Sequence, residues 1–363
     1  MITHTRSGEE TFPALREACR QAGFDATQAQ LIRALDNGIW RLPDGVVVRV
    51  HQPGTISSAQ NEIHGAYWLY GNGIPVSMPR RSEPVVAAGR PVTFWTDLGP
   101  GGPANPADAA RILRTLHHLP VPADLRLPSH DPFARFPAQI TAAHAIPEEK
   151  DWLRAHASRL RELWLALDWP TPRCVIHGDA GPGNTMGTVT GTFLIDWERL
   201  SIGHREWDQA TAVWHRDLFG ASSDDYTAFA LVYGHDITTW PSYQIIRDIR
   251  SLCATLFALR HATVSVAVRA EADHRLACLR RTAGPTPKPW IGRTWQWTRL
   301  AASAGGRPTD ASARSEPGHP SLGKSPEGVI LHGKGLPGDE QVSPRSPLRR
   351  PAPPSGPTPD GTG

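Results

Sequence analysis

Three polar side chains near the middle of the chain have the types that a phosphoryl-transfer reaction requires. Asp179 and Asn184 lie five residues apart in a run rich in glycine and proline, and Asp196 follows twelve residues later. Phosphoryl transfer needs a carboxylate aligned on the acceptor hydroxyl and oxygen ligands that hold Mg²⁺ across the phosphates. We therefore predict that Asp179 is the general base and that Asn184 and Asp196 are the magnesium ligands.

The segments that lead into these residues are predicted to be strands. Val175 and Ile176 precede the run that contains Asp179, and an apolar segment at residues 193–195 precedes Asp196. Residues 188–192 between them are typical of a hairpin tip, so we expect both acids at the ends of neighbouring strands. Gly181 and Gly183 are predicted to allow the sharp turn that brings Asn184 back toward Asp179.

The order of these motifs resembles a known family. His177-Gly-Asp179-x4-Asn184, then Ile-Asp196-Trp-Glu198, then Trp-Asp208 is similar to the motifs of the aminoglycoside phosphotransferase and choline-kinase-like family, relatives of the protein kinases. The resemblance covers about residues 15–280. It implies an α+β, protein-kinase-like fold with two lobes, a small antiparallel-sheet N-lobe and a larger, mostly helical C-lobe. It also implies ATP and Mg²⁺ as cofactors.

Three further residues of these motifs are predicted to support the catalytic loop, residues 177–184, which carries Asp179 and Asn184. We place His177 in the catalytic site as a residue that orients the loop rather than one that takes part in the chemistry. Asp208 is expected to cap a helix and to bind backbone N–H groups of the loop. Glu198 is expected to form an ion pair with a nearby arginine.

The phosphate-binding residues are predicted from the N-terminal strands. The N-terminal lobe has neither a Gly-x-Gly-x-x-Gly run nor a Walker lysine motif, and the turn at Asn37 resembles the family's short nucleotide-covering loop. In kinase-like proteins the third strand presents a lysine to the phosphates, and a glutamate on the next helix steadies it. Arg49 stands in that strand here, with Glu62 thirteen residues later, so Arg49 is the predicted clamp and Glu62 its partner. The alternative is an arginine that faces solvent.

The adenine-binding residues are predicted at the end of the N-terminal lobe. Backbone groups of residues 93–97 are expected to contact the edge of the base. Phe94 or Trp95 is expected to pack on the base, although packing in the hydrophobic core would explain either aromatic side chain equally well.

Hydrophobic periodicity and turn signals predict the elements that position these residues. The N-terminal lobe (residues 1–98) is expected to hold a helix near 15–22, strands at 30–35, 39–42 and 46–50, a helix at 58–70 and a strand at 91–95. The catalytic and substrate-binding lobe (99–300) is expected to hold helices at 107–119, 151–167, 207–219, 225–233 and 243–261. The glycine- and proline-rich residues 99–103 are predicted to mark the boundary between the lobes.

The last part of the chain differs in composition. Residues 301–363 contain no Phe, Tyr or Trp, and Pro and Gly make up 23 of these 63 residues. Such a segment buries too little apolar surface to offset the entropy lost on ordering, so we predict a disordered tail. Its Ser-Pro and Pro-Pro sequences would suit a partner domain, but an inert extension is the preferred interpretation.

Overall composition argues against several classes of partner and location. A net charge of +3 on 363 residues is too small to indicate nucleic acid or a membrane surface. No stretch approaches the roughly 20 apolar residues of a membrane span. The four cysteines are widely spaced and the N-terminus lacks the apolar core of a signal peptide, so we expect a cytoplasmic protein. The sequence does not identify protein partners.

The sequence therefore predicts an ATP-dependent phosphotransferase that acts on a hydroxyl of a small molecule. The acceptor would be an aminoglycoside-type antibiotic or a similar amino or hydroxy compound; choline, homoserine or another small metabolite is the alternative. A catalytically inactive, kinase-like binding scaffold is a third reading. A polycationic acceptor would need acids of the helical lobe, and the candidates are Asp217, Asp224, Asp225, Asp236 and Asp248.

Overall fold

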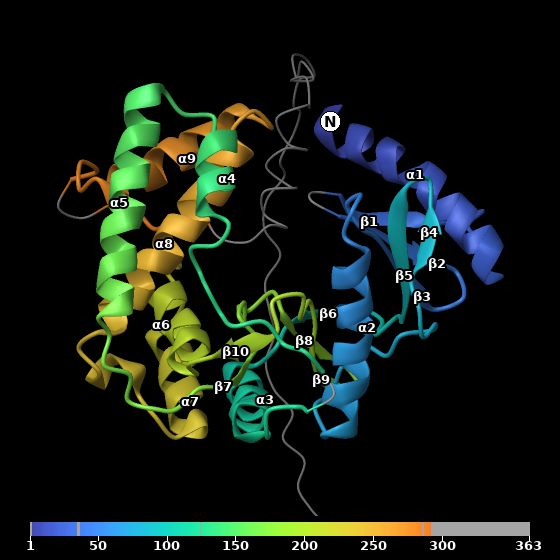
Figure 1. Ribbon diagram of the computed structural model, residues 1–363, viewed down its shortest axis with the longest axis horizontal. Helices are drawn as coiled ribbons and strands as arrows, with labels where there is room; N and C mark the ends of the chain where they lie inside the picture. Colours follow the sequence, from blue (N-terminus) through green and yellow to red (C-terminus); the bar gives the residue numbers. More distant parts are fainter. Residues whose placement is uncertain (1, 35–36, 124, 285–286, 292–363) are drawn as a thin grey trace, which may run out of the picture. The chain divides into compact units, whose positions relative to one another are not determined.

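The computed structural model describes residues 2–34, 37–123, 125–284 and 287–291. The chain divides into two units, residues 1–308 and 309–363, and every described residue belongs to the first. Within that unit the fold is the predicted α+β arrangement, an antiparallel sheet followed by a mostly helical region (Figure 1). The predicted tail lies outside the described residues.

The N-terminal part of the described chain is built on a sheet of five antiparallel strands. Their order across the sheet is β1 (Gln30–Ala34), β2 (Gly38–Leu42), β3 (Val46–Val50), β5 (Arg90–Thr96) and β4 (Val85–Ala87). The three strands predicted before residue 51 are confirmed to within one residue. Gly45 has a φ of 67° in the turn between β2 and β3, as its Asp-Gly signal predicts.

The two faces of this sheet have different environments because side chains alternate along a strand. Helix α1 (Ile2–Ala22) covers one face, where Trp40, Val48 and Phe94 belong to the same core cluster as Leu15 of the helix. The other face carries Arg49 and borders a cavity. Figure 1 shows α1 on one side of the sheet and α2 (Ile56–Gly71) on the other.

Helices make up most of the described chain after residue 103. Those at the predicted positions are α3 (Pro106–His118), α5 (Pro147–Leu165), α6 (Glu206–Phe219), α7 (Ser223–Tyr233) and α8 (Tyr243–Arg260). Two more helices, α4 (Phe136–Ala142) and α9 (Val266–Leu279), were not predicted, and a short 3₁₀ helix, η1, spans Ile237–Thr239. Helices α4, α5, α6, α8 and α9 share one hydrophobic core.

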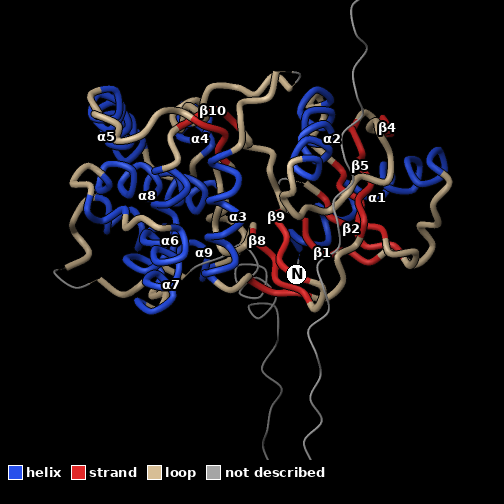
Figure 2. Tube along the Cα trace, turned by 90° about the horizontal axis from the view of Figure 1, so that it is seen from below, coloured by secondary structure: helices blue, strands red, loops and turns tan. Residues whose placement is uncertain are grey.

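The pairing of the strands around the catalytic loop differs from the prediction. Strand β7 (Cys174–Ile176) pairs with β10 (Ser201–Gly203), whereas β8 (Thr185–Thr188) and β9 (Gly191–Leu194) form the predicted hairpin. The two acids therefore do not follow neighbouring strands. Residues 101–103, predicted as part of a boundary, form β6 (Gly101–Pro103), which pairs with β8. Figure 2 shows β8 and β9 near the strands of the N-terminal sheet.

A second core cluster joins the sheet region to the helical region. It combines Ile63 of α2 and Trp95 of β5 with Leu113 of α3 and Trp197 after β9. The rings of Trp95 and Trp197 meet edge to face at a centroid distance of 5.6 Å. This cluster holds α2 against the segment that follows β9. It therefore fixes the position of Glu62, which is in α2, relative to Asp196, which follows β9. Among the described helices, none is both long and apolar enough to cross a membrane.

Candidate active site

The first turn of α6 holds the catalytic loop through its backbone. The carboxylate of Asp208 accepts hydrogen bonds from the backbone N–H groups of His177 (2.7 Å) and Gly178 (3.0 Å). Burial opposes the ionisation of Asp208, but a hydrogen bond from His117 (3.1 Å) holds its pKa below the ordinary value. Asp208 thus binds the loop as predicted, from inside the first turn rather than from the cap position, which Arg205 occupies.

His177 connects the catalytic loop to the segment that carries Asp196. Its side chain is fully buried, and its Nδ1 accepts a hydrogen bond from the backbone N–H of Asp179 at 3.2 Å. The opposite nitrogen, Nε2, then carries the proton and donates to the carbonyl of Ile195 at 3.1 Å. His177 therefore links the catalytic loop to the segment after β9, although β7 and β9 do not pair with each other. This contact is in keeping with the orienting role predicted for the histidine.

The turn in the catalytic loop depends on a different glycine from those predicted. Gly178 has a φ of 81°, whereas neither Gly181 nor Gly183 has a positive φ. A Cβ atom on Gly178 would also lie 2.6 Å from the backbone oxygen of Arg199. Gly178 is therefore required at its position, and the prediction for Gly181 and Gly183 is wrong in this respect.

Asn184 and Asp196 line the same cavity and offer it oxygen atoms. The amide nitrogen of Asn184 donates to the backbone carbonyl of Asp179 at 2.8 Å, which leaves its Oδ1 for another partner. Burial opposes the ionisation of Asp196, but Arg49 and Arg33 lower its pKa to about 2. Among the described residues, no three or more His, Cys, Asp and Glu side chains are arranged so that they could hold a metal ion by themselves. Two oxygen ligands fit Mg²⁺, whose other positions would fall to phosphate and water.

Arg49 is buried among three acids, of which Glu62 is also buried and Asp196 and Glu198 are partly exposed. Its guanidinium donates to Glu62 (2.6 Å), Asp196 (3.0 Å) and Glu198 (2.6 Å). With its amide oxygen turned toward Arg49, Asn37 accepts from Nη2 at 2.8 Å and from Nε at 3.1 Å. The predicted contacts of Arg49 with Glu62 and of Glu198 with an arginine are present, and the solvent-facing alternative for Arg49 is wrong.

The electrostatics of this cluster follow from its burial. Burial raises the pKa of Glu62 to about 7 although Arg49 acts in the opposite direction. Burial also works against the charge on Arg49, but Glu62, Asp196 and Glu198 hold the pKa of Arg49 above its ordinary value. Arg49 is therefore a permanent cation that several carboxylates share.

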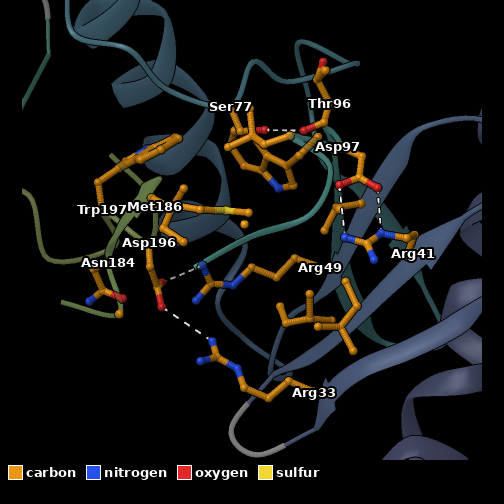
Figure 3. A pocket seen from close by; sticks show the side chains of 18 of the residues that line it. Arg33, Arg41, Arg49, Ser77, Thr96, Asp97, Asn184, Met186, Asp196 and Trp197 are labelled. Carbon is orange, nitrogen blue, oxygen red and sulfur yellow. Dashed lines mark hydrogen bonds and ion pairs between the residues drawn. The ribbon is translucent and has the colours of Figure 1, made fainter. Parts of the chain in front are cut away.

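A cavity of about 590 Å³ lies between the sheet and the β8–β9 hairpin. Figure 3 shows Asn184, Asp196, Arg33 and Arg49 gathered at one end of it and Asp97 at the other. Apolar side chains line its walls between the two ends, from the sheet and from the hairpin: Ile39, Val47, Met186 and Ile195. These residues could not be singled out from the sequence, because an apolar residue on a strand looks like any core residue.

The other end of the cavity has unpaired backbone groups. Among the described residues, the carbonyl of Asp97 and the N–H of Leu98 have no hydrogen-bond partner, while the N–H of Asp97 donates to Gly45 (2.9 Å). The side chain of Asp97 accepts two hydrogen bonds from Arg41, at 2.6 and 3.2 Å. The backbone groups available to a base thus lie at the end of the predicted 93–97 segment and just beyond it.

The two aromatic residues predicted for the base lie on opposite faces of the sheet. Trp95 lines the cavity. Phe94 is buried on the α1 face, where its ring stacks on Phe24 at a centroid distance of 4.8 Å. The prediction that Phe94 contacts a bound base is therefore wrong, because neighbouring residues of a strand point to opposite sides.

Comparison with known proteins identifies the family. The family model described as "Phosphotransferase enzyme family" matches residues 28–246, which is more than half of the chain. The chain therefore belongs to this family, and the predicted resemblance is confirmed. None of the curated proteins compared with the chain matches it.

Solved structures show the same fold at low sequence identity. A choline/ethanolamine kinase family protein from Mesorhizobium loti is 18% identical, with a TM-score of 0.54, and the match covers 82% of this chain and 99% of the other. An amicoumacin kinase in complex with AMP-PNP, Ca²⁺ and Ami is 14% identical, with a TM-score of 0.56 and coverages of 75% and 94%. Wild-type aminoglycoside 2′-phosphotransferase-IIIa in its GDP complex is 13% identical, with a TM-score of 0.53 and coverages of 74% and 98%.

Proposed function

We propose that this phosphotransferase moves the γ-phosphoryl group of ATP to a hydroxyl of a small molecule. The observation that carries the proposal is the shared cavity, in which the Arg49–Glu62 pair, Asn184 and Asp196 come together at one end. A triphosphate needs this combination of a cation and metal-binding oxygens. The kinase and phosphotransferase relatives solved with AMP-PNP and GDP support a nucleotide donor.

Each residue of the proposed site has a separate task. Asp179, which is half-buried in the catalytic loop, would accept the proton of the acceptor hydroxyl. Asn184 and Asp196 would hold Mg²⁺, which neutralises charge on the phosphates. Asn37 and Arg49 would face the phosphates, with Glu62 steadying Arg49. Trp95 and the apolar walls would enclose the base.

The acceptor is proposed only as a hydroxylated small molecule, of the aminoglycoside type or a similar amino or hydroxy compound. Of the acids predicted to receive a polycation, Asp217 accepts from the Tyr243 hydroxyl, and Asp248 pairs with Arg247 at 3.0 Å. Asp236 accepts from Thr238. These three acids already have hydrogen-bond or ion-pair partners, so they do not favour an aminoglycoside over choline, homoserine or another metabolite.

Release of ADP from Mg·ATP in the presence of a panel of hydroxylated acceptors tests the proposal. We expect Asp179→Asn to lower kcat by at least about a hundredfold, since a positioned general base contributes about 10²–10⁴-fold. The variant should bind ATP as the parent does, because Asp179 does not line the nucleotide cavity. A parent protein that binds no nucleotide with Mg²⁺ would instead indicate the inactive scaffold.

A further inference from the structure

We propose that Arg33 is a second phosphate-binding residue of the nucleotide cavity, acting beside Arg49. The inference rests on the proposed function, since it needs a nucleotide in that cavity. It starts from strand pairing. Arg33 pairs with Ile39 between β1 and β2, and Ile39 pairs with Arg49 between β2 and β3. Cross-strand partners point to the same face, so the two arginines flank Ile39 in one row on the cavity face.

This row lies at the metal-binding end of the cavity. The guanidinium of Arg33 lies 3.6 Å from Asp196 Oδ2, and that of Arg49 lies 3.0 Å from Asp196 Oδ1. Figure 3 shows both side chains directed from the sheet toward Asp196. A polyphosphate bridged to Asp196 by a metal would therefore lie within reach of both arginines.

The two arginines differ in what else they bind. Arg49 forms ion pairs with Glu62 and Glu198 as well as with Asp196. It would therefore keep two carboxylate partners if Asp196 bound a metal ion. Within the described part of the chain, Arg33 forms one ion pair, which is with Asp196. Its side chain is 36% exposed. Once Asp196 binds a cation, Arg33 loses that partner. A phosphate oxygen is the natural replacement, because guanidinium binds phosphate with charge-assisted hydrogen bonds.

Arg41 supplies a matched control. It lies two residues along β2 from Ile39, on the same face, in the row of Val47 and Trp95. Arg41 also lines the cavity, but it donates two hydrogen bonds to Asp97 at the end opposite Asp196. The sheet thus places Arg33 and Arg49 at one end of the cavity and Arg41 at the other, and only the two near Asp196 are assigned to the phosphates.

Binding of adenosine, AMP, ADP and ATP to the full chain and to R33Q, R33K and R41Q tests the assignment. With Mg²⁺, we expect R33Q to weaken ATP binding roughly tenfold, the lower end for a hydrogen bond to a charged group. Adenosine binding should be unchanged, and R33K should recover part of the loss. R41Q should affect adenosine and ATP equally, since it lies at the base end.

Four outcomes would overturn the assignment. One is equal loss for adenosine and ATP in R33Q, which would make Arg33 a structural residue of the sheet. Another is a loss of ATP binding that disappears in EDTA, which would mean that Arg33 acts through Asp196 and the metal rather than on phosphate. If the parent chain binds none of the nucleotides, the proposed function fails, and the assignment fails with it. If the parent binds ATP and R33Q binds it equally well, the assignment alone fails.

Discussion

Arg49 shows at the residue scale why an arginine is not a simple substitute for lysine. Its planar guanidinium reaches Glu62, Asp196 and Glu198 from two nitrogens, at 2.6–3.0 Å. A lysine ammonium is a single point that cannot serve three separated carboxylates with the same geometry. The residue therefore joins the α2 side of the cavity to the segment after β9.

We expect Arg49→Ala to lower kcat/KM for ATP by about tenfold to a hundredfold. A charge-assisted contact contributes about 1.5–3 kcal/mol, which sets that scale. Glu62→Ala should cause a milder defect, because it removes support and leaves the cation. Steady-state kinetics of the double variant should show less than additive losses, since both residues serve one interaction.

Arg49→Lys separates charge from geometry in the same assay. Partial activity is expected, since the charge remains and the bidentate fork is lost. Unchanged activity in Arg49→Ala would contradict the clamp and would assign the phosphates to other groups near Asn37.

The burial of His51 predicts that the stability of the folded protein depends on pH. It is 5% exposed, and its Nε2 lies 2.9 Å from Thr93 Oγ1. Burial, together with the charge of Arg49, lowers its pKa from 6.5 to about 3. The folded protein keeps His51 neutral while the unfolded chain takes up a proton. The stability that the neutral His51 contributes is therefore fully present above pH 6.5 and is lost progressively as the pH falls toward 3.

Between pH 7 and pH 5 the parent should lose about 2 kcal/mol more unfolding free energy than His51→Gln. Denaturant unfolding at the two pH values measures this difference. Other buried histidines, such as His130, are present in both proteins and cancel. Equal pH dependence in the two proteins would show that His51 titrates normally.

The sequence predicted some of these residues and missed others for physical reasons. The resemblance to the kinase-like family, applied to Arg49 on the third strand and Glu62 on the following helix, predicted their contact. Phe94 and Trp95 were indistinguishable, because the choice of face depends on pairing with β3, which lies more than 40 residues away. Arg33 was not singled out, since an arginine before a turn is typical of an exposed strand end.

At the scale of elements, the catalytic loop depends on contacts between segments that are distant in sequence. Strand β7 pairs with β10, and the backbone of the loop is held by α6. Local patterns predicted β7 and α6 but neither β10 nor these contacts, since pairing is decided by long-range packing. Helix α9 was missed because a buried pair, Arg275 with Glu271 at 2.7 Å, interrupts its apolar pattern.

Gly178→Ala tests the turn of the catalytic loop. Alanine would have to adopt a φ near 81° with its Cβ 2.6 Å from a backbone oxygen. Strained backbone conformations cost roughly 1–3 kcal/mol, so we expect a loss of at least that size. Turnover should also fall, because Asp179 follows directly. Denaturant unfolding and kcat together measure both effects.

Gly183→Ala is the control within the same loop. Nothing lies within 4 Å of a Cβ atom at this position, and its φ is not positive. Its unfolding free energy should therefore stay within about 0.5 kcal/mol of the parent value. Similar losses in the two variants would show that the whole loop, rather than Gly178, demands glycine.

At the scale of the whole molecule, the cavity draws on both parts of the described fold. The sheet supplies the arginines and one apolar wall, while the β8–β9 hairpin and the loops beside it supply Asn184, Asp196 and the other wall. A nucleotide that contacts both parts stabilises the folded state by mass action. At a hundred times its Kd, the gain is about 2.7 kcal/mol.

The stabilisation by bound nucleotide can be compared between the parent and a chain that lacks the predicted tail, which lies outside the described residues. The tail (residues 301–363) contains no Phe, Tyr or Trp, so we expect its deletion to leave Tm, kcat and the Mg·ATP-induced rise in Tm close to the parent values. Differential scanning fluorimetry with and without Mg·ATP, together with the ADP-release assay, measures all three. A lower Tm without nucleotide would show that the segment packs on the enzyme. A smaller Mg·ATP shift at an unchanged starting Tm would instead show that it contributes to nucleotide binding, which its composition does not predict.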